Sequence, residues 1–184
     1  MIPTSLADFA IAAPEVTLLG VACVVLLLDL FVGEARRGLV YIATLIGLAL
    51  TAYVTVVGMP AEGRTVALGG LYVADGVATV LKLVAIVTVA VVLVYSRGYI
   101  SRRGLLQGEY FVLSLFVLLG VMVMASASSL LSMYMGIEVM ALSAYGLVAI
   151  NRDNPVSAES AMKYFVLGAI ASGTLLYGIS ILYG

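Results

Sequence analysis

The chain has 184 residues, of which 64% are hydrophobic and only 10% are charged, and its formal net charge at pH 7 is -1. Its mean hydropathy of +1.21 lies outside the range of soluble globular domains, so the composition indicates an integral membrane protein. The sequence has no His and a single Cys, which excludes bis-His haem, Cys-ligated iron–sulfur and zinc sites made by this chain alone. We expect Cys23 to be a packed small residue.

Six apolar segments are long enough to cross a bilayer, which requires about 20 mostly apolar residues in a helix. Alternation with a period of two is absent from them, which disfavours a transmembrane barrel. The fourth and fifth segments must be separate helices, because one helix over both would be about 60 Å long. The sequence therefore predicts an all-α, polytopic transmembrane helical bundle that forms a single domain over residues 1–184. The expected spans cover residues 14–32, 39–58, 75–95, 109–125, 129–150 and 156–183.

The basic residues of the connecting loops are distributed unevenly between the two sides of the membrane. Cytoplasmic loops carry an excess of Lys and Arg, so the odd-numbered loops are predicted to be cytoplasmic and both termini to lie outside. Six arginines support this orientation and one opposes it: Arg36, Arg37, Arg97, Arg102, Arg103 and Arg152, against Arg64.

Two ionisable residues lie inside consecutive expected spans. Glu138 is near the middle of the fifth span, and Lys163 is in the first half of the sixth. Each costs about 3 kcal/mol to insert, so intramembrane charges usually mark proton or ion pathways. Because the loop between the two spans is short, we expect both groups to share one polar cavity and to have coupled proton affinities. The alternative is an ion pair that only fixes the helix register.

Lys82 lies about a third of the way along the third expected span, seven residues after Asp75. Its ammonium group either joins the same polar axis or extends along its flexible stem to the outer interface. The sequence leaves both alternatives open. It predicts no metal site and no cofactor site in this chain.

Several segments resemble the antiporter-like membrane subunits of respiratory complex I. The general resemblance is carried by EYFVL at 109–113 and YMGIEVMAL at 134–142. A narrower resemblance, to subunit N of bacterial NADH:quinone oxidoreductase, is carried by LDLF at 28–31, SAESAMKYFVLGAIASG at 157–173 and LLYGISILYG at 175–184. The resemblance implies that Glu138 and Lys163 belong to a proton-translocating half-channel. It also implies that NADH, FMN, the iron–sulfur clusters and quinone are bound by partner subunits.

The resemblance further implies the lipid bilayer of the bacterial inner membrane and other membrane subunits of complex I as partners, with no nucleic acid. Members of this family continue with further helices that carry additional lysines. The chain is therefore interpreted as the N-terminal part of such a subunit, or as an incomplete gene product, that does not pump protons by itself. Two alternatives stay open. One is a subunit of a related sodium/proton antiporter or membrane-bound hydrogenase, and the other is a structural membrane scaffold whose charges only lock helices together.

Overall fold

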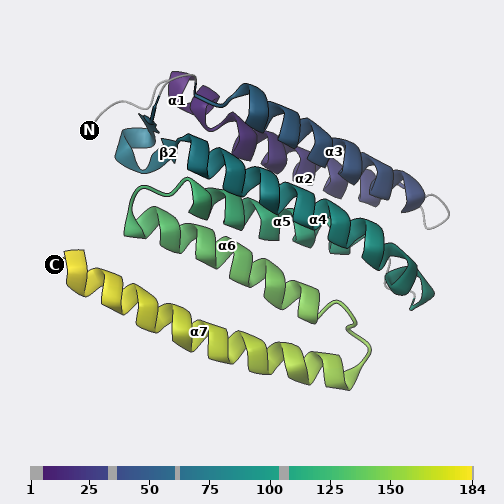
Figure 1. The fold of residues 1–184 in the computed structure, drawn as a ribbon. Coiled ribbons are helices and arrows are strands. Elements are labelled where there is room, and N and C mark those ends of the chain that lie inside the picture. The colour runs from purple at the N-terminus through teal and green to yellow at the C-terminus, as the bar shows by residue number, and fades with distance from the viewer. Residues whose placement is uncertain (1–5, 33–36, 61–62, 104–107, 184) are drawn as a thin grey trace.

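Six long helices run in alternating directions in the computed structural model (Figure 1). The structure describes residues 6–32, 37–60, 63–103 and 108–183. All six helices are long and apolar enough to cross a membrane, which confirms the predicted polytopic helical bundle. Their bounds are α2 (Ala13–Phe31), α3 (Arg37–Val57), α4 (Gly76–Arg102), α5 (Gly108–Ala125), α6 (Leu130–Val148) and α7 (Pro155–Tyr183).

The helix bounds differ from the predicted spans chiefly in α4, which continues seven residues beyond the predicted end at residue 95. The segment after Tyr95 is polar and leaves the apolar run, but a helix does not need apolar residues to continue. Arg102 Nε donates to the carbonyl of Gly98, and Ser96 shares a hydrogen bond of 2.8 Å with Tyr110 of α5. Most of the expected loop after residue 96 is therefore helical, and its last residues, 104–107, lie outside the described part of the chain.

A short helix and a hairpin at one end of the bundle were not predicted. Helix α1 (Leu6–Ile11) precedes α2, and the antiparallel strands β1 (Thr65–Ala67) and β2 (Tyr72–Ala74) follow α3. The 3-10 turn η2 (Leu68–Gly70) joins the strands, and its φ of +65° at Gly69 and +94° at Gly70 are values that favour glycine. Three-residue strands are too short to leave a periodic signal in the sequence.

The hairpin is hydrogen-bonded to the turn between α5 and α6. The backbone N–H of Val73 donates to the carbonyl of Ser126 at 2.8 Å, and the N–H of Ser128 donates to the carbonyl of Leu71 at 3.1 Å. This turn occurs where the sequence required one, between Ala125 and Leu130. The hairpin lies at the same end of the bundle as α1 and the C-terminal end of α7 (Figure 1).

The apolar core lies among α2, α3, α4 and α5, with α5 at its centre. Leu115, Leu118 and Met122 of α5 are fully buried. On its other side α5 packs so closely on α6 that a Cβ at Gly120 would lie 2.5 Å from the backbone N of Met140. This contact fixes the position of α6 relative to the core.

Helix α7 lies at the edge of the bundle, where it packs mainly against α6 (Figure 1). Most of its apolar side chains are exposed, and so are many on the outward faces of α2 and α4. Cys23 is also exposed on α2, so the expectation that it packs inside was wrong. Exposed apolar faces of this kind are compatible with lipid or with further helices as neighbours.

Candidate functional site

Glu138 lies close to the midpoint of α6, roughly 12 Å from the start of that helix. One of its carboxylate oxygens, Oε1, accepts a hydrogen bond from the Ser172 hydroxyl of α7. The same hydroxyl oxygen lies 2.9 Å from the hydroxyl of Tyr134, one turn before Glu138 on α6. The carboxylate is therefore the end of a chain of three hydrogen-bonding groups between α6 and α7. No other Asp, Glu, Lys or Arg occurs within α6.

Lys163 is not brought together with Glu138. Its Nζ lies 2.5 Å from Oε1 of Glu159, one turn earlier on α7, and both side chains are about two-thirds exposed, at 69% and 65%. Lys163 precedes Ser172 by nine residues, which is two and a half helical turns. The two residues therefore lie about 14 Å apart along the axis of α7 and on opposite faces of that helix. The expectation that Glu138 and Lys163 share one cavity is therefore corrected.

The physical reason is that the short loop made α6 and α7 neighbours but did not determine how α7 is rotated about its own axis. Apolar side chains surround α7 on all sides, so its sequence does not define the face that packs. The observed face uses Tyr145 of α6, which makes edge-on ring contacts with Tyr164 and Phe165.

A buried ion pair occupies the hairpin end of the bundle. Lys82 of α4 is 3% exposed, and its Nζ lies 2.6 Å from Oε1 of Glu15, a residue in the first turn of α2. Tyr72 of β2 joins the pair: its hydroxyl accepts from Lys82 Nζ and donates to Glu15 Oε2, both at 2.8 Å. Lys82 therefore does not extend to the interface. It completes a closed ring of three polar groups.

Sequence reasoning did not single out Glu15 or Tyr72 for this ring. A signal was present, because a lysine inside a span requires a counter-charge and Glu15 is the acid at the start of the first apolar segment. The position of Glu15 in the first turn of α2 also suits a carboxylate, since the helix N-terminus carries partial positive charge. Tyr72 gave no signal, because the hairpin that carries it was not predicted.

Burial, and secondarily the negative charge of Glu15, raises the pKa of Tyr72 well above its ordinary value of 10.0. The phenol therefore stays protonated and neutral at physiological pH. A neutral phenol accepts one hydrogen bond while it donates another, as it does between Lys82 and Glu15.

Comparisons with known proteins define the class first. Residues 127–184 match the family described as NADH:quinone oxidoreductase/Mrp antiporter, TM. This segment contains Glu138, Ser172 and Lys163. The chain is also similar in structure to a chain of respiratory complex I from Thermus thermophilus with bound aureothin, with a TM-score of 0.72 and 28% identity over 93% of this chain and 36% of that one.

More particularly, the chain belongs to the family of NADH-quinone oxidoreductase subunit N. It is 51% identical to that subunit from Thiobacillus denitrificans over 182 residues, which are 99% of this chain and 38% of the relative. It is also 51% identical to subunit N of Nitrosomonas europaea, over 97% of this chain and 37% of the relative. The chain thus spans little more than a third of the length of these relatives, and the resemblance seen in its motifs is confirmed.

Proposed function

We propose that the chain forms part of a proton-translocating membrane subunit of an NADH:quinone oxidoreductase, in which Glu138 binds and releases the proton. The observation that carries the proposal is the carboxylate near the midpoint of α6, hydrogen-bonded to a hydroxyl of the next helix. Keeping a charge at such a depth costs about 3 kcal/mol or more, and a residue kept at that cost is expected to have a function. The names of the relatives support the same assignment.

The chain of hydroxyls allows the proton to move by a change in hydrogen-bond direction. When Glu138 is ionised, Ser172 donates to it and is free to accept from Tyr134. When Glu138 is protonated, its carboxyl O–H donates to Ser172, whose own proton turns toward Tyr134. Serine and tyrosine hydroxyls both donate and accept, so both contacts are kept in either direction.

Lys163 is proposed as a second charged group of the same pathway, one that acts on Glu138 from a distance. Its exposed face of α7 leaves room for a further proton-handling helix, and the relatives have almost two-thirds of their length outside the matched region. A Lys163→Arg variant tests this role, because a guanidinium stays protonated under all working conditions. Full pumping by that variant would show that a fixed positive charge is sufficient.

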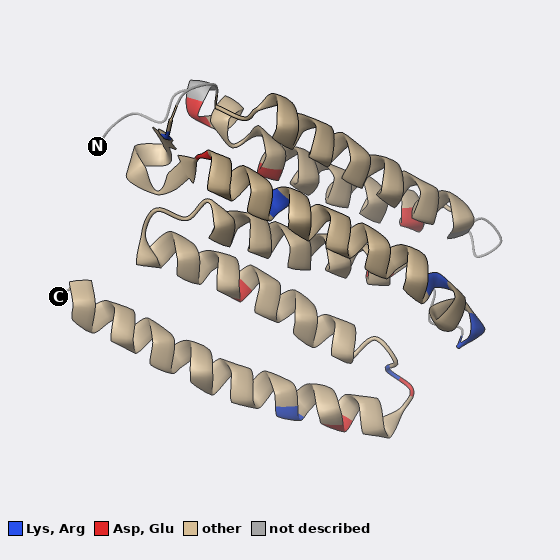
Figure 2. Ribbon diagram, viewed as in Figure 1, with Lys and Arg blue, Asp and Glu red and all other residues tan. Residues whose placement is uncertain are grey.

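The proposed setting is the bacterial inner membrane, with both marked chain ends on the outer side and the other membrane subunits of complex I as partners. Arginines gather at the end of the bundle opposite the hairpin (Figure 2), as a cytoplasmic surface would require. NADH, FMN, the iron–sulfur clusters and quinone are proposed to bind other subunits. The names of the relatives favour this setting over an antiporter or hydrogenase subunit.

The decisive experiment replaces Glu138 in the full-length subunit within its complex and measures proton pumping in proteoliposomes. Glu138→Gln should abolish most pumping while the complex still assembles, and Glu138→Asp should be milder because it keeps a titrating group. Glu109→Gln is the matched control, since that carboxylate is half-exposed and pairs with Arg152 near the helix end. Normal pumping by Glu138→Gln would refute the assignment, and failed assembly would favour the scaffold alternative.

A further inference from the structure

We propose that Glu15, Lys82 and Tyr72 form a second proton-exchange site, separate from Glu138 and reached by water through a cavity at the hairpin end of the bundle. The inference goes beyond the proposed function, because it concerns different helices and does not require Glu138 to carry a proton. Three observations support it: the closed ring of polar groups, a cavity that ends on that ring, and a buried hydroxyl in the cavity wall that faces the ring.

The ring joins three elements that are distant in sequence. The carboxylate of Glu15 comes from α2, the phenol of Tyr72 from β2 and the ammonium of Lys82 from α4, with all three contacts between 2.6 and 2.8 Å. Each residue is less than a tenth exposed. One acid, one base and one neutral group that both donates and accepts are the components needed to take up a proton and to redistribute it.

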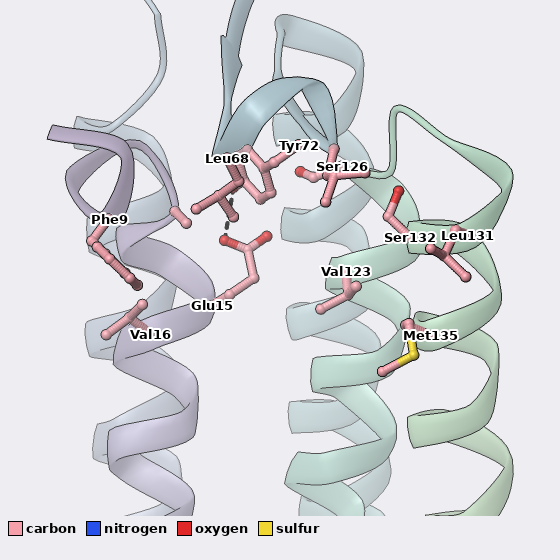
Figure 3. Close-up of a pocket in the computed structure, with 12 residues that line it drawn as sticks. Phe9, Glu15, Val16, Leu68, Tyr72, Val123, Ser126, Leu131, Ser132 and Met135 are labelled. Carbon is pink, nitrogen blue, oxygen red and sulfur yellow. Dashed lines mark hydrogen bonds between the residues drawn. The ribbon is translucent and has the colours of Figure 1, made fainter. Parts of the chain in front are cut away.

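A cavity of about 380 Å³ reaches this ring from the side of α1 and the α5–α6 turn (Figure 3). Its walls are mostly apolar, with Phe9, Val123 and Met135 among them, while Glu15 and Tyr72 lie at its polar end. A water occupies about 30 Å³ of liquid volume, so the cavity has room for several waters. Its apolar walls offer them no partners, so we expect water to be retained only at the end that carries Glu15 and Tyr72.

Ser126 adds a polar group to the wall of the cavity. It is 1% exposed, and its hydroxyl interacts with the Tyr72 side chain but lies within ordinary hydrogen-bonding distance of no group in the described part of the chain. Figure 3 shows this hydroxyl pointing toward Tyr72. A water between Ser126 and the ring would give this hydroxyl a hydrogen bond of ordinary length.

A hydronium in the cavity gives one proton to the phenolic oxygen of Tyr72 as the phenolic O–H proton passes to Glu15. One O–H bond breaks and one forms on tyrosine, a new O–H bond forms on the carboxylate, and the hydronium becomes water. The phenol stays neutral throughout, and the ring changes from no net charge to a charge of one, carried by Lys82.

Among the described residues, three further charged groups belong to the elements at this end of the bundle. They are Asp8 on α1, Arg64 before β1, and Asp75, whose carboxylate accepts a hydrogen bond of 2.7 Å from the N–H of Ala78 at the N-cap of α4. The remaining charged residues of α2, α4 and α5 lie toward the opposite ends of those helices. A change in protonation measured at this end of the bundle is therefore assigned to Glu15 only when it is lost on replacement of Glu15.

The first arm of the test asks whether water reaches the ring. Ser126→Cys, in a Cys23→Ala background of the full-length subunit in native membranes, is treated with a membrane-impermeant cationic thiosulfonate from the hairpin side. Only a hydrated thiol ionises and reacts, so the rate should be on the order of tenfold or more above that of Ser143→Cys. Ser143 lies away from the cavity and is slightly more exposed, at 7% against 1% for Ser126, so burial alone would favour the control. Val123→Cys provides a second cavity probe if Ser126→Cys does not fold.

Equal, slow modification of the cavity and control cysteines would overturn the proposal. Adding Glu138→Gln should leave the labelling rate unchanged, so a failure of this inference is distinguishable from a failure of the proposed function.

The second arm asks whether Glu15 takes up the proton. Infrared difference spectra on acidification should show a protonated carboxyl band that is lost in the double variant Glu15→Gln, Lys82→Met and retained in Glu138→Gln. Replacing both charges together avoids leaving one buried and unpaired, so the double variant should fold. A band that persists in the double variant, or one that is absent from the unmodified protein, would leave the ion pair with a structural role only and refute the proposal.

Discussion

The contact between α5 and α6 predicts that Gly120→Ala destabilises the bundle. The added Cβ would lie 2.5 Å from the backbone N of Met140 and 2.6 Å from the carbonyl oxygen of Gly136, and neither backbone atom can rotate away. Ordinary contacts begin at 3.4 Å, so the two helices would have to separate by about 0.9 Å. Overpacking of this kind costs about 1–3 kcal/mol, which outweighs the gain of about 1 kcal/mol from replacing glycine within a helix.

The assay is thermal unfolding of the purified protein in detergent, with each 1 kcal/mol expected to lower the midpoint by about 2–4 °C for a chain of this length. Gly20→Ala is the matched control, because a Cβ at that position in α2 meets no atom within 4 Å. It should be as stable as the unmodified protein or slightly more stable. If Gly120→Ala unfolded at the same temperature as Gly20→Ala, the inferred backbone contact between α5 and α6 would be wrong.

Three further predictions follow from the polar groups. Ser172→Ala removes the hydrogen bond to Glu138, so the infrared band of the protonated Glu138 carboxyl should move to higher frequency; an unshifted band would contradict the contact. Lys163→Met should leave that band in place, because Lys163 pairs with Glu159 on the opposite face of α7. A band shift as large as that of Ser172→Ala would instead indicate direct coupling between Lys163 and Glu138. Since the pKa of Tyr72 is raised in the folded state, the fold binds more protons than the unfolded chain above pH 10, and stability should fall as pH rises through that region. The free energy of unfolding, measured across that pH range, should fall less steeply for Tyr72→Phe.

The sequence predicted those features that depend on length, hydropathy and position along a helix. Six helices and the turn at residues 125–128 followed from the thickness of a bilayer, and the depth of Glu138 followed from its place in the fifth apolar run. These properties are local, so they do not depend on how the helices are arranged around one another.

The pairing of charges could not be predicted, because it depends on rotation about helix axes. Glu15 and Lys82 meet only because α2 and α4 are rotated so that these residues face one another. Neither apolar helix has a polar stripe from which its inward face could be predicted. The same freedom explains why Lys163 lies away from Glu138. The sequence did not single out Ser172 or Tyr134, and only the contact across two helices gave them a role.

The attachment of the hairpin to the α5–α6 turn has a mechanical consequence. Two backbone hydrogen bonds, from Val73 to Ser126 and from Ser128 to Leu71, join the hairpin that carries Tyr72 to the turn before α6. Sliding α6 along its neighbours would break both bonds, each worth about 1 kcal/mol, and would pull on the phenol between Glu15 and Lys82. The hairpin and the start of α6 are therefore held in register at this end of the bundle.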